Sequence, residues 1–316
     1  MTEKTSMEVL QEIDALFRNQ EYDQAEMLAA ESIHRFPLEA DEFIYLRMCA
    51  ATRLGRIPQA LQWMTEVLEA GGWYSDFLLR KSPSFEPLQG MPEFEQLVKV
   101  SLQQQEADQK KEPAHYILTP ERGDAPWPLF LSLHGNSHSA DWESQYWHSL
   151  VSSGWLLAMV ESALGHWRGG YIWDDGEQAQ RDLEGCFRSL APHYPVDLQK
   201  VILGGFSYGG QRAIEHAIKG TVGALGFLVL GPYLPEMDPW TSLLDAGFPQ
   251  GLRGYIITGE LDESRTNSLA LASLLQARGV ACEVEEVPGE GHWFPADFDS
   301  SLERGLDFIL NRSSKS

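Results

Sequence analysis

Residues 205–209, Gly-Phe-Ser-Tyr-Gly, form the segment whose residue types and spacing most clearly permit chemistry. A serine hydroxyl is a poor nucleophile until a neighbouring base accepts its proton. The pattern Gly-x-Ser-x-Gly, with Val-Ile-Leu before it and an amphipathic stretch after it, is typical of a sharp strand-to-helix turn that presents the serine. An ordinary glycine-rich turn between a strand and a helix can have the same sequence pattern. The context favours the first interpretation, so we predict that Ser207 is a nucleophile.

A base and an acid follow in the order that this chemistry requires. His292 comes just after one expected strand, and Asp262 comes just after another. Because the carboxyl ends of parallel strands meet at one edge of a sheet, these side chains and Ser207 are expected to lie together there. A histidine that is oriented by a carboxylate is the usual base for a serine. Two further acids compete with Asp262 for this role, Glu260 and Glu263.

A fourth element is Leu-His-Gly-Asn-Ser at residues 133–137, which ends an expected central strand. A tetrahedral intermediate needs two preorganised N–H donors near its oxyanion. We predict that the backbone N–H groups of Tyr208 and Asn136 are these donors, with Ser137 as the second candidate in this loop. His134 is expected to brace the loop rather than to act as a second base.

Strands and helices alternate regularly after residue 113, which predicts a mostly parallel sheet covered on both faces. The expected strands are 115–119, 128–134, 155–161, 200–205, 225–231, 254–259 and 281–287. The expected helices are 140–152, 175–191, 208–219, 263–278 and 297–311. Residues 231–253 leave room for one short helix.

The region before residue 110 contains no strand signal and is predicted to be all-helical, with helices at 6–19, 22–35, 39–54, 57–70, 74–81 and 92–108. Residues 16–25 resemble residues 51–60, with Ala25 matching Ala60. This pattern resembles tetratricopeptide repeats, which are helix–turn–helix units of about 34 residues. A plain helical bundle is the alternative. The polar stretch 103–113 is expected to be a linker, which gives a helical domain at 1–110 and a catalytic domain at 111–316.

The ordered set of motifs in residues 113–316 resembles the α/β-hydrolase superfamily, and most of all its carboxylesterase, phospholipase and dienelactone-hydrolase-like branch. The prolyl-oligopeptidase-like branch is similar too. The resemblance implies an α/β fold with a doubly wound, mostly parallel sheet, and a serine hydrolase that needs no cofactor. The short segment 231–253 has no room for a lipase-style cap.

Aromatic side chains on loops at the expected catalytic edge could form walls for an apolar acyl or aryl group. Core packing is the alternative for each of them. Arg168 could hold a substrate carboxylate, although an ion pair with Asp174 or Asp175 is the favoured interpretation. The candidate substrate contacts are Trp142, Trp167, Arg168, Trp240 and Trp293.

The composition excludes several partners and sites. The 316 residues carry 24 Lys and Arg against 46 Asp and Glu, a net charge of −22. Such a chain is repelled by phosphate backbones and anionic membranes, so we expect no nucleic-acid or membrane partner. Three separated cysteines predict buried free thiols and no metal site. Neither a signal peptide nor a long apolar stretch occurs, which predicts a cytoplasmic protein.

The sequence therefore predicts a serine hydrolase that cleaves small carboxylic esters or related acyl compounds through an acyl-enzyme. A peptidase or thioesterase with the same residues is the alternative enzyme. The alternative from another class is an interaction scaffold, in which the repeat-like helices bind a partner and the hydrolase domain is vestigial. In either case we expect the N-terminal helices to serve a protein partner or a homodimer.

Overall fold

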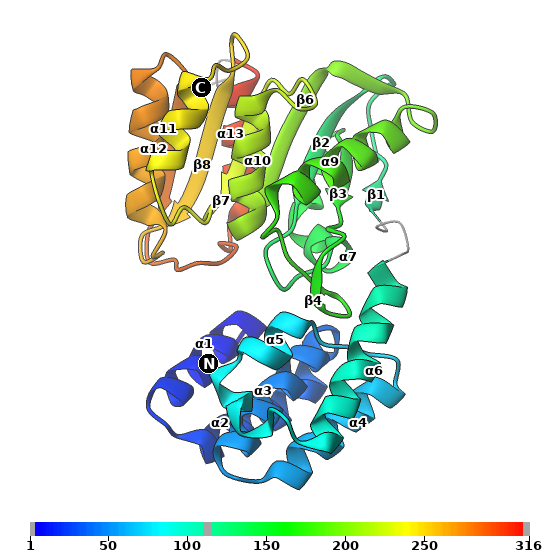
Figure 1. The fold of residues 1–316 in the computed structure, drawn as a ribbon. Helices are drawn as coiled ribbons and strands as arrows, with labels where there is room; N and C mark the ends of the chain where they lie inside the picture. Colours follow the sequence, from blue (N-terminus) through cyan, green and yellow to red (C-terminus); the bar gives the residue numbers. More distant parts are fainter. Residues whose placement is uncertain (1–3, 110–114, 312–316) are drawn as a thin grey trace. The chain divides into compact units, whose positions relative to one another are not determined.

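The computed structural model describes residues 4–109 and 115–311. Two compact units are present (Figure 1). One unit combines Met1–Glu112 with Leu164–Tyr171, and the other combines Pro113–Ala163 with Ile172–Ser316. The expected boundary at residues 110 and 111 lies outside the described residues. The sequence placed 164–171 in the catalytic region, whereas these residues pack with the helical unit.

In the helical unit the first four helices each pack against the next, and the sixth packs against the fourth and the fifth. Sequence signals set the helix ends: Thr5 and Glu8 form a capping box at the first helix, and Pro58 lies in the first turn of the fourth. Ala25 and Ala60 are both buried, at the matching positions of two helices. The helices are α1 (Ser6–Arg18), α2 (Tyr22–Arg35), α3 (Ala40–Arg53), α4 (Ile57–Glu69), α5 (Asp76–Lys81) and α6 (Pro92–Gln109), with 3₁₀ turns at Pro37–Glu39 and Pro83–Leu88.

A short hairpin completes this unit. Its strands, β4 (Gly165–Trp167) and β5 (Gly170–Tyr171), pair antiparallel. Trp167 is buried in the core of the helical unit and forms an isolated bridge with Tyr74. The Ser75 N–H donates to the His166 carbonyl at 2.7 Å, and the Phe77 and His166 rings stack at 5.6 Å. The burial of Trp167 explains why the hairpin belongs to the helical unit.

The second unit is built on a seven-stranded sheet in the order β1-β3-β2-β6-β7-β8-β9. Only the edge strand β1 runs antiparallel to its neighbour; the other pairs are parallel. The sequence predicted each of these strands to within a few residues. The strands are β1 (Tyr116–Leu118), β2 (Trp127–Leu133), β3 (Leu156–Val160), β6 (Val196–Phe206), β7 (Gly226–Leu230), β8 (Arg253–Gly259) and β9 (Ala281–Val287).

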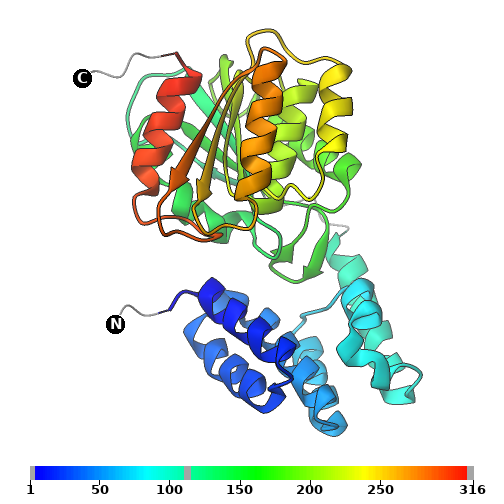
Figure 2. The same cartoon turned by 90° about the vertical axis from the view of Figure 1, so that its left-hand side faces the viewer.

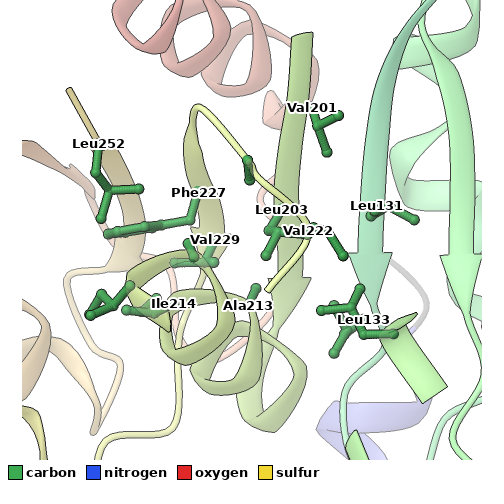
Figure 3. Packing of buried hydrophobic residues seen from close by; sticks show 14 of the residues in the cluster. Leu131, Leu133, Val201, Leu203, Ala213, Ile214, Val222, Phe227, Val229 and Leu252 are labelled. Atoms are coloured by element: carbon green, nitrogen blue, oxygen red, sulfur yellow. The ribbon is translucent and has the colours of Figure 1, made fainter. Parts of the chain in front are cut away.

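Both faces of the sheet are covered by helices, as Figure 2 shows for this unit. Alternate residues of each strand face opposite cores: Leu131 and Leu203 pack into one cluster (Figure 3), while Phe130 and Ile202 pack into the other. The first cluster is covered by α9 (Gly176–Leu190), α10 (Ser207–Lys219), α11 (Asp238–Asp245) and α12 (Arg265–Ala277). The second is covered by the segment 140–152 and by α13 (Phe298–Ile309).

The segment 140–152 differs from the single helix that was expected. It forms α7 (Ala140–Glu143), a 3₁₀ turn (Ser144–Trp147) and α8 (Ser149–Ser152). The Ser144 hydroxyl donates to the Asp141 carbonyl at 2.7 Å, a local side-chain bond that competes with helix continuation. Glu143 and Trp147 are both fully buried in this segment.

Two other sequence expectations concern the whole chain. Cys49, Cys186 and Cys282 are buried and free, as predicted. Among the described residues, no helix combines the length and the apolar character that crossing a membrane requires.

The hairpin generates a prediction about truncation. Removing residues 1–112 alone leaves Trp167 without the core that buries it, so we expect this variant to aggregate and to bind a hydrophobic dye. A variant that also replaces 164–171 with a short glycine link is expected to unfold cooperatively in urea. The link can be short because the Ser162 hydroxyl donates to the Ile172 carbonyl at 2.6 Å, which keeps the hairpin ends adjacent. Equal solubility of the two variants would show that the hairpin needs no helical partner.

Candidate active site

The structure brings together the three side chains that the sequence proposed for nucleophilic chemistry. Ser207 follows β6, Asp262 follows β8 and His292 follows β9 at the carboxyl edge of the sheet. The Nε2 atom of His292 lies 3.0 Å from the Ser207 Oγ, and its Nδ1 atom lies 2.9 Å from the Asp262 Oδ2. Ser207 has a φ of 54°, a strained value for a residue with a side chain. Such strain is typical of a nucleophile turn.

Asp262, and neither of the competing glutamates, contacts the histidine. Its other oxygen accepts the Ser264 N–H at 2.7 Å, which fixes the carboxylate. Burial alone would raise the pKa of Asp262, but the hydrogen bond and charge of His292 and the Ser264 N–H outweigh it and lower that pKa. The Glu260 carboxylate instead accepts the Gly289 N–H at 2.9 Å, and Glu263 is exposed.

Two glycines permit the close approaches on which this geometry depends. A Cβ at Gly209 would lie 2.1 Å from the Leu133 carbonyl oxygen, so the nucleophile turn packs directly on the end of β2. A Cβ at Gly231 would lie 2.8 Å from the Asp262 Oδ2 and 3.1 Å from the His292 Nδ1. The sequence prediction missed Gly231. The available signal was a Gly-Pro pair directly after an expected strand that ends at the same edge.

The two predicted oxyanion donors occupy suitable backbone positions. The Tyr208 N–H lies in the first turn of α10, where helix N–H groups have no helical partner and point toward anions. Asn136 and Ser137 form a turn, and Ser137 has a φ of 71°. The Asn136 side chain binds a neighbouring segment instead, because its Oδ1 accepts the Trp173 N–H at 2.9 Å and its Nδ2 donates to Asp174 at 3.3 Å.

Buried glutamate side chains bond to the loop at residues 134–140, which carries the predicted oxyanion donor Asn136 and is called the oxyanion loop below. Glu143 accepts the Gly135 N–H at 2.7 Å, and Glu161 accepts the Ala140 N–H at 3.0 Å while lying 3.1 Å from the His134 Nε2. His134 is fully buried and its carbonyl accepts the Trp173 indole N–H at 2.7 Å. This placement agrees with a bracing role for His134. The sequence prediction did not single out either glutamate, although Glu161 follows a strand end.

The five candidate substrate contacts separate into two groups. The Trp142 and Trp293 rings lie 6.0 Å apart, and Trp293 directly follows the catalytic-site histidine. For the other three residues, the packing argues against the expected substrate contact. Trp167 is buried in the core of the helical unit, and Arg168 donates to the Ala70 carbonyl at 3.3 Å rather than pairing with Asp174 or Asp175. Trp240, a residue of α11, is buried in the core cluster between that helix and the sheet.

No group of three His, Cys, Asp or Glu side chains that could hold a metal occurs within the described ranges. The groups that the site itself offers for chemistry are the hydroxyl, imidazole and carboxylate of the triad geometry and the loop N–H donors.

Comparisons with known proteins agree with this architecture. The fold is similar to that of an uncharacterized protein from Bacillus cereus, with 24% identity and a TM-score of 0.55, over 98% of this chain and 100% of that one. A dienelactone hydrolase-like promiscuous phosphotriesterase from metagenomic libraries matches 62% of this chain and 91% of its own, with 17% identity and a TM-score of 0.51. A ferulic acid esterase matches 64% and 93%, with 15% identity and a TM-score of 0.50. No family model and no curated protein matches. The chain thus has an α/β-hydrolase-like fold.

The acid assignment yields a prediction. Asp262→Asn is expected to lower kcat for an ester about 10⁴-fold, because an amide cannot hold the histidine in the tautomer that accepts the serine proton. Glu260→Gln serves as the matched control, and we expect it to stay within tenfold of the parent. Steady-state kinetics on p-nitrophenyl esters measure both. If Glu260→Gln lowers kcat severely while Asp262→Asn hardly changes it, the acid of the triad is Glu260 and the assignment to Asp262 is wrong.

The buried His134 yields a second prediction, on stability. Burial alone would lower the pKa of His134, but the hydrogen bond and charge of Glu161, the Gly135 carbonyl and the charge of Glu143 raise it overall. A raised folded-state pKa adds stability that is fully present below the unfolded value of about 6.5 and is lost as pH rises through the folded value.

We therefore expect the difference in unfolding free energy between the parent and His134→Gln to be larger near pH 5.5 than near pH 9. Urea titrations of both proteins across this range measure the difference. A difference that is constant with pH would mean that folding leaves the pKa of His134 unchanged, and a difference that is smaller near pH 5.5 would mean that folding lowers it.

Proposed function

We propose that this protein is a serine hydrolase that cleaves carboxylic esters or related acyl compounds. The observation that carries the proposal is the position of His292, whose two ring nitrogens lie within hydrogen-bonding distance of Ser207 and Asp262. Ser207 and the His292 side chain retain access to solvent, as a reacting group must. The likeness in fold to an esterase and to a dienelactone hydrolase-like enzyme supports the class.

The geometry suits a two-step acyl transfer. The Ser207 Oγ attacks the acyl carbon while the His292 Nε2 takes its proton, and Asp262 stabilises the imidazolium that forms. The N–H groups of Tyr208 and Asn136 hold the oxyanion. The tetrahedral intermediate expels the alcohol, which takes the proton from His292. Water then attacks the acyl-enzyme with His292 again as base, releasing the carboxylic acid and regenerating Ser207.

A peptidase or a thioesterase would use the same residues, and it remains the alternative enzyme. The rival proposal, a scaffold with a vestigial hydrolase domain, predicts relaxed constraints around the triad. Against it stand Gly209 and Gly231, where any side chain would collide with Leu133 in one case and with Asp262 or His292 in the other.

For the helical unit we propose a tetratricopeptide-like module that serves a protein partner or a homodimer and also anchors the hairpin 164–171. Ser162 lies two residues before the hairpin and Trp173 lies two residues after it. Trp173 bonds to Asn136 and to His134 in the oxyanion loop, so the segment that leaves the hairpin is part of the support of that loop. The unit need not contribute a reacting group.

The test of the hydrolase is covalent labelling. A fluorophosphonate probe is expected to modify Ser207 and no other serine, as read by peptide mass spectrometry. Ser207→Ala and His292→Ala should each lower kcat for p-nitrophenyl esters by roughly 10⁴–10⁶, because nucleophile and base act as one unit. An adduct on another serine, or full esterase activity in Ser207→Ala, would overturn the mechanism.

A further inference from the structure

Building on the proposed hydrolase activity, we propose that His138 determines substrate specificity. In this proposal its Nε2 atom accepts a hydrogen bond from a hydroxyl group carried by an aromatic part of the substrate. The substrate class is thus an ester with a hydroxylated aryl group, in preference to the same ester without the hydroxyl.

His138 lies one aromatic ring away from the catalytic-site histidine. Its ring stacks on Phe206 at 5.9 Å between centroids and 14° between planes, and Phe206 lies 4.9 Å from the His292 ring. Trp142 lies 4.2 Å from the His138 ring, and the Trp293 ring meets it edge-on at 5.9 Å. His138 therefore belongs to an aromatic cluster that includes Phe206, the residue before Ser207, and it adds a polar atom to that cluster. An aryl group packed along such a cluster gains apolar contact and edge-to-face geometry.

Glu143 fixes the orientation of His138. The Glu143 Oε2 atom lies 2.9 Å from the His138 Nδ1 and accepts the Gly135 N–H at 2.7 Å, while its Oε1 accepts the Trp147 indole N–H at 3.2 Å. With the Glu143 Oε2 atom as the acceptor of this bond, the Nδ1 atom carries the proton. In the neutral imidazole the Nε2 atom then has the free lone pair, which makes it an acceptor.

The Nε2 atom is available for a ligand. Among the residues that the structure describes, this atom has no hydrogen-bond partner. It also keeps some exposed surface, since it is absent from the unpaired atoms that are fully buried. The His138 side chain is 9% exposed, so this edge of the ring reaches solvent while the opposite edge faces Glu143. A site with a positioned acceptor discriminates strongly between a substrate that carries the matching hydroxyl and one that lacks it, because the unmatched acceptor loses its water without replacement.

The experiment compares methyl esters of phenylacetic and 3-phenylpropanoic acids that are unsubstituted, hydroxylated or methoxylated at each ring position, at a pH near 8.5. We expect at least one hydroxylated ester to exceed both of its counterparts in kcat/KM by about tenfold in the parent protein. His138→Asn keeps an N–H donor for Glu143 but removes the Nε2 acceptor, and we expect this preference to fall below about twofold. His138→Gln can place a carbonyl oxygen near the Nε2 position, so partial recovery is expected. His148→Gln, an exposed histidine of the same segment, is the matched control and should keep the full preference.

Fluorophosphonate labelling of the parent protein separates the two proposals. If Ser207 is not labelled, the hydrolase proposal fails. If Ser207 is labelled but no hydroxylated ester is preferred, or a preference survives undiminished in a folded His138→Asn, the specificity proposal is wrong while the hydrolase stands. A preference for methoxy over hydroxyl esters in the parent would also overturn it, since it would make Nε2 a donor. The absence of any hydroxyl preference in the parent protein overturns the specificity proposal even if a variant does not fold.

Discussion

The nucleophile turn lies directly on the end of β2, and most of the site geometry depends on this contact. A Cβ at Gly209 would lie 2.1 Å from the Leu133 carbonyl oxygen and 2.3 Å from that of His134, so only glycine fits there. The approach fixes the spacing between Ser207 and the loop that begins at His134. Because an oxyanion site acts through donors placed before the reaction, the position of this loop matters as much as the nucleophile itself.

The buried carboxylate of Glu143 holds the loop that begins at His134. Three N–H donors, from Gly135, His138 and Trp147, converge on the Glu143 carboxylate, which has no exposed surface. A buried carboxylate is costly unless its oxygens are fully bonded, and here each oxygen has a partner. The same bonds orient the His138 ring and anchor the loop backbone at Gly135. If both proposals hold, the substrate contact of His138 and the position of the oxyanion donor at Asn136 depend on one side chain, Glu143.

The parts of the site that could be predicted from sequence are those governed by strand ends. Ser207, Asp262 and His292 each follow a strong strand pattern, and parallel strands bring their carboxyl ends to one edge, so their meeting needed no tertiary information. The support of the oxyanion loop could not be predicted in this way. Glu143 lies in α7 and contacts Gly135 and His138 of the loop, tertiary contacts that no periodicity of the sequence shows.

The hairpin 164–171 shows the same limit and also constrains how the chain folds. Its sequence lies within the catalytic region, and nothing local marks Trp167 as a core residue of the helical unit. Residues 1–112 therefore lack part of their core until the chain has been made beyond Tyr171. By then the residues of β1 to β3 have also been made, so the helical unit completes its core only after synthesis of the second unit has begun. The hairpin ends are joined by the Ser162–Ile172 hydrogen bond, and Trp173 follows at once with its bonds to Asn136 and His134. Completing the helical core and ordering the support of the oxyanion loop thus involve one continuous stretch of backbone.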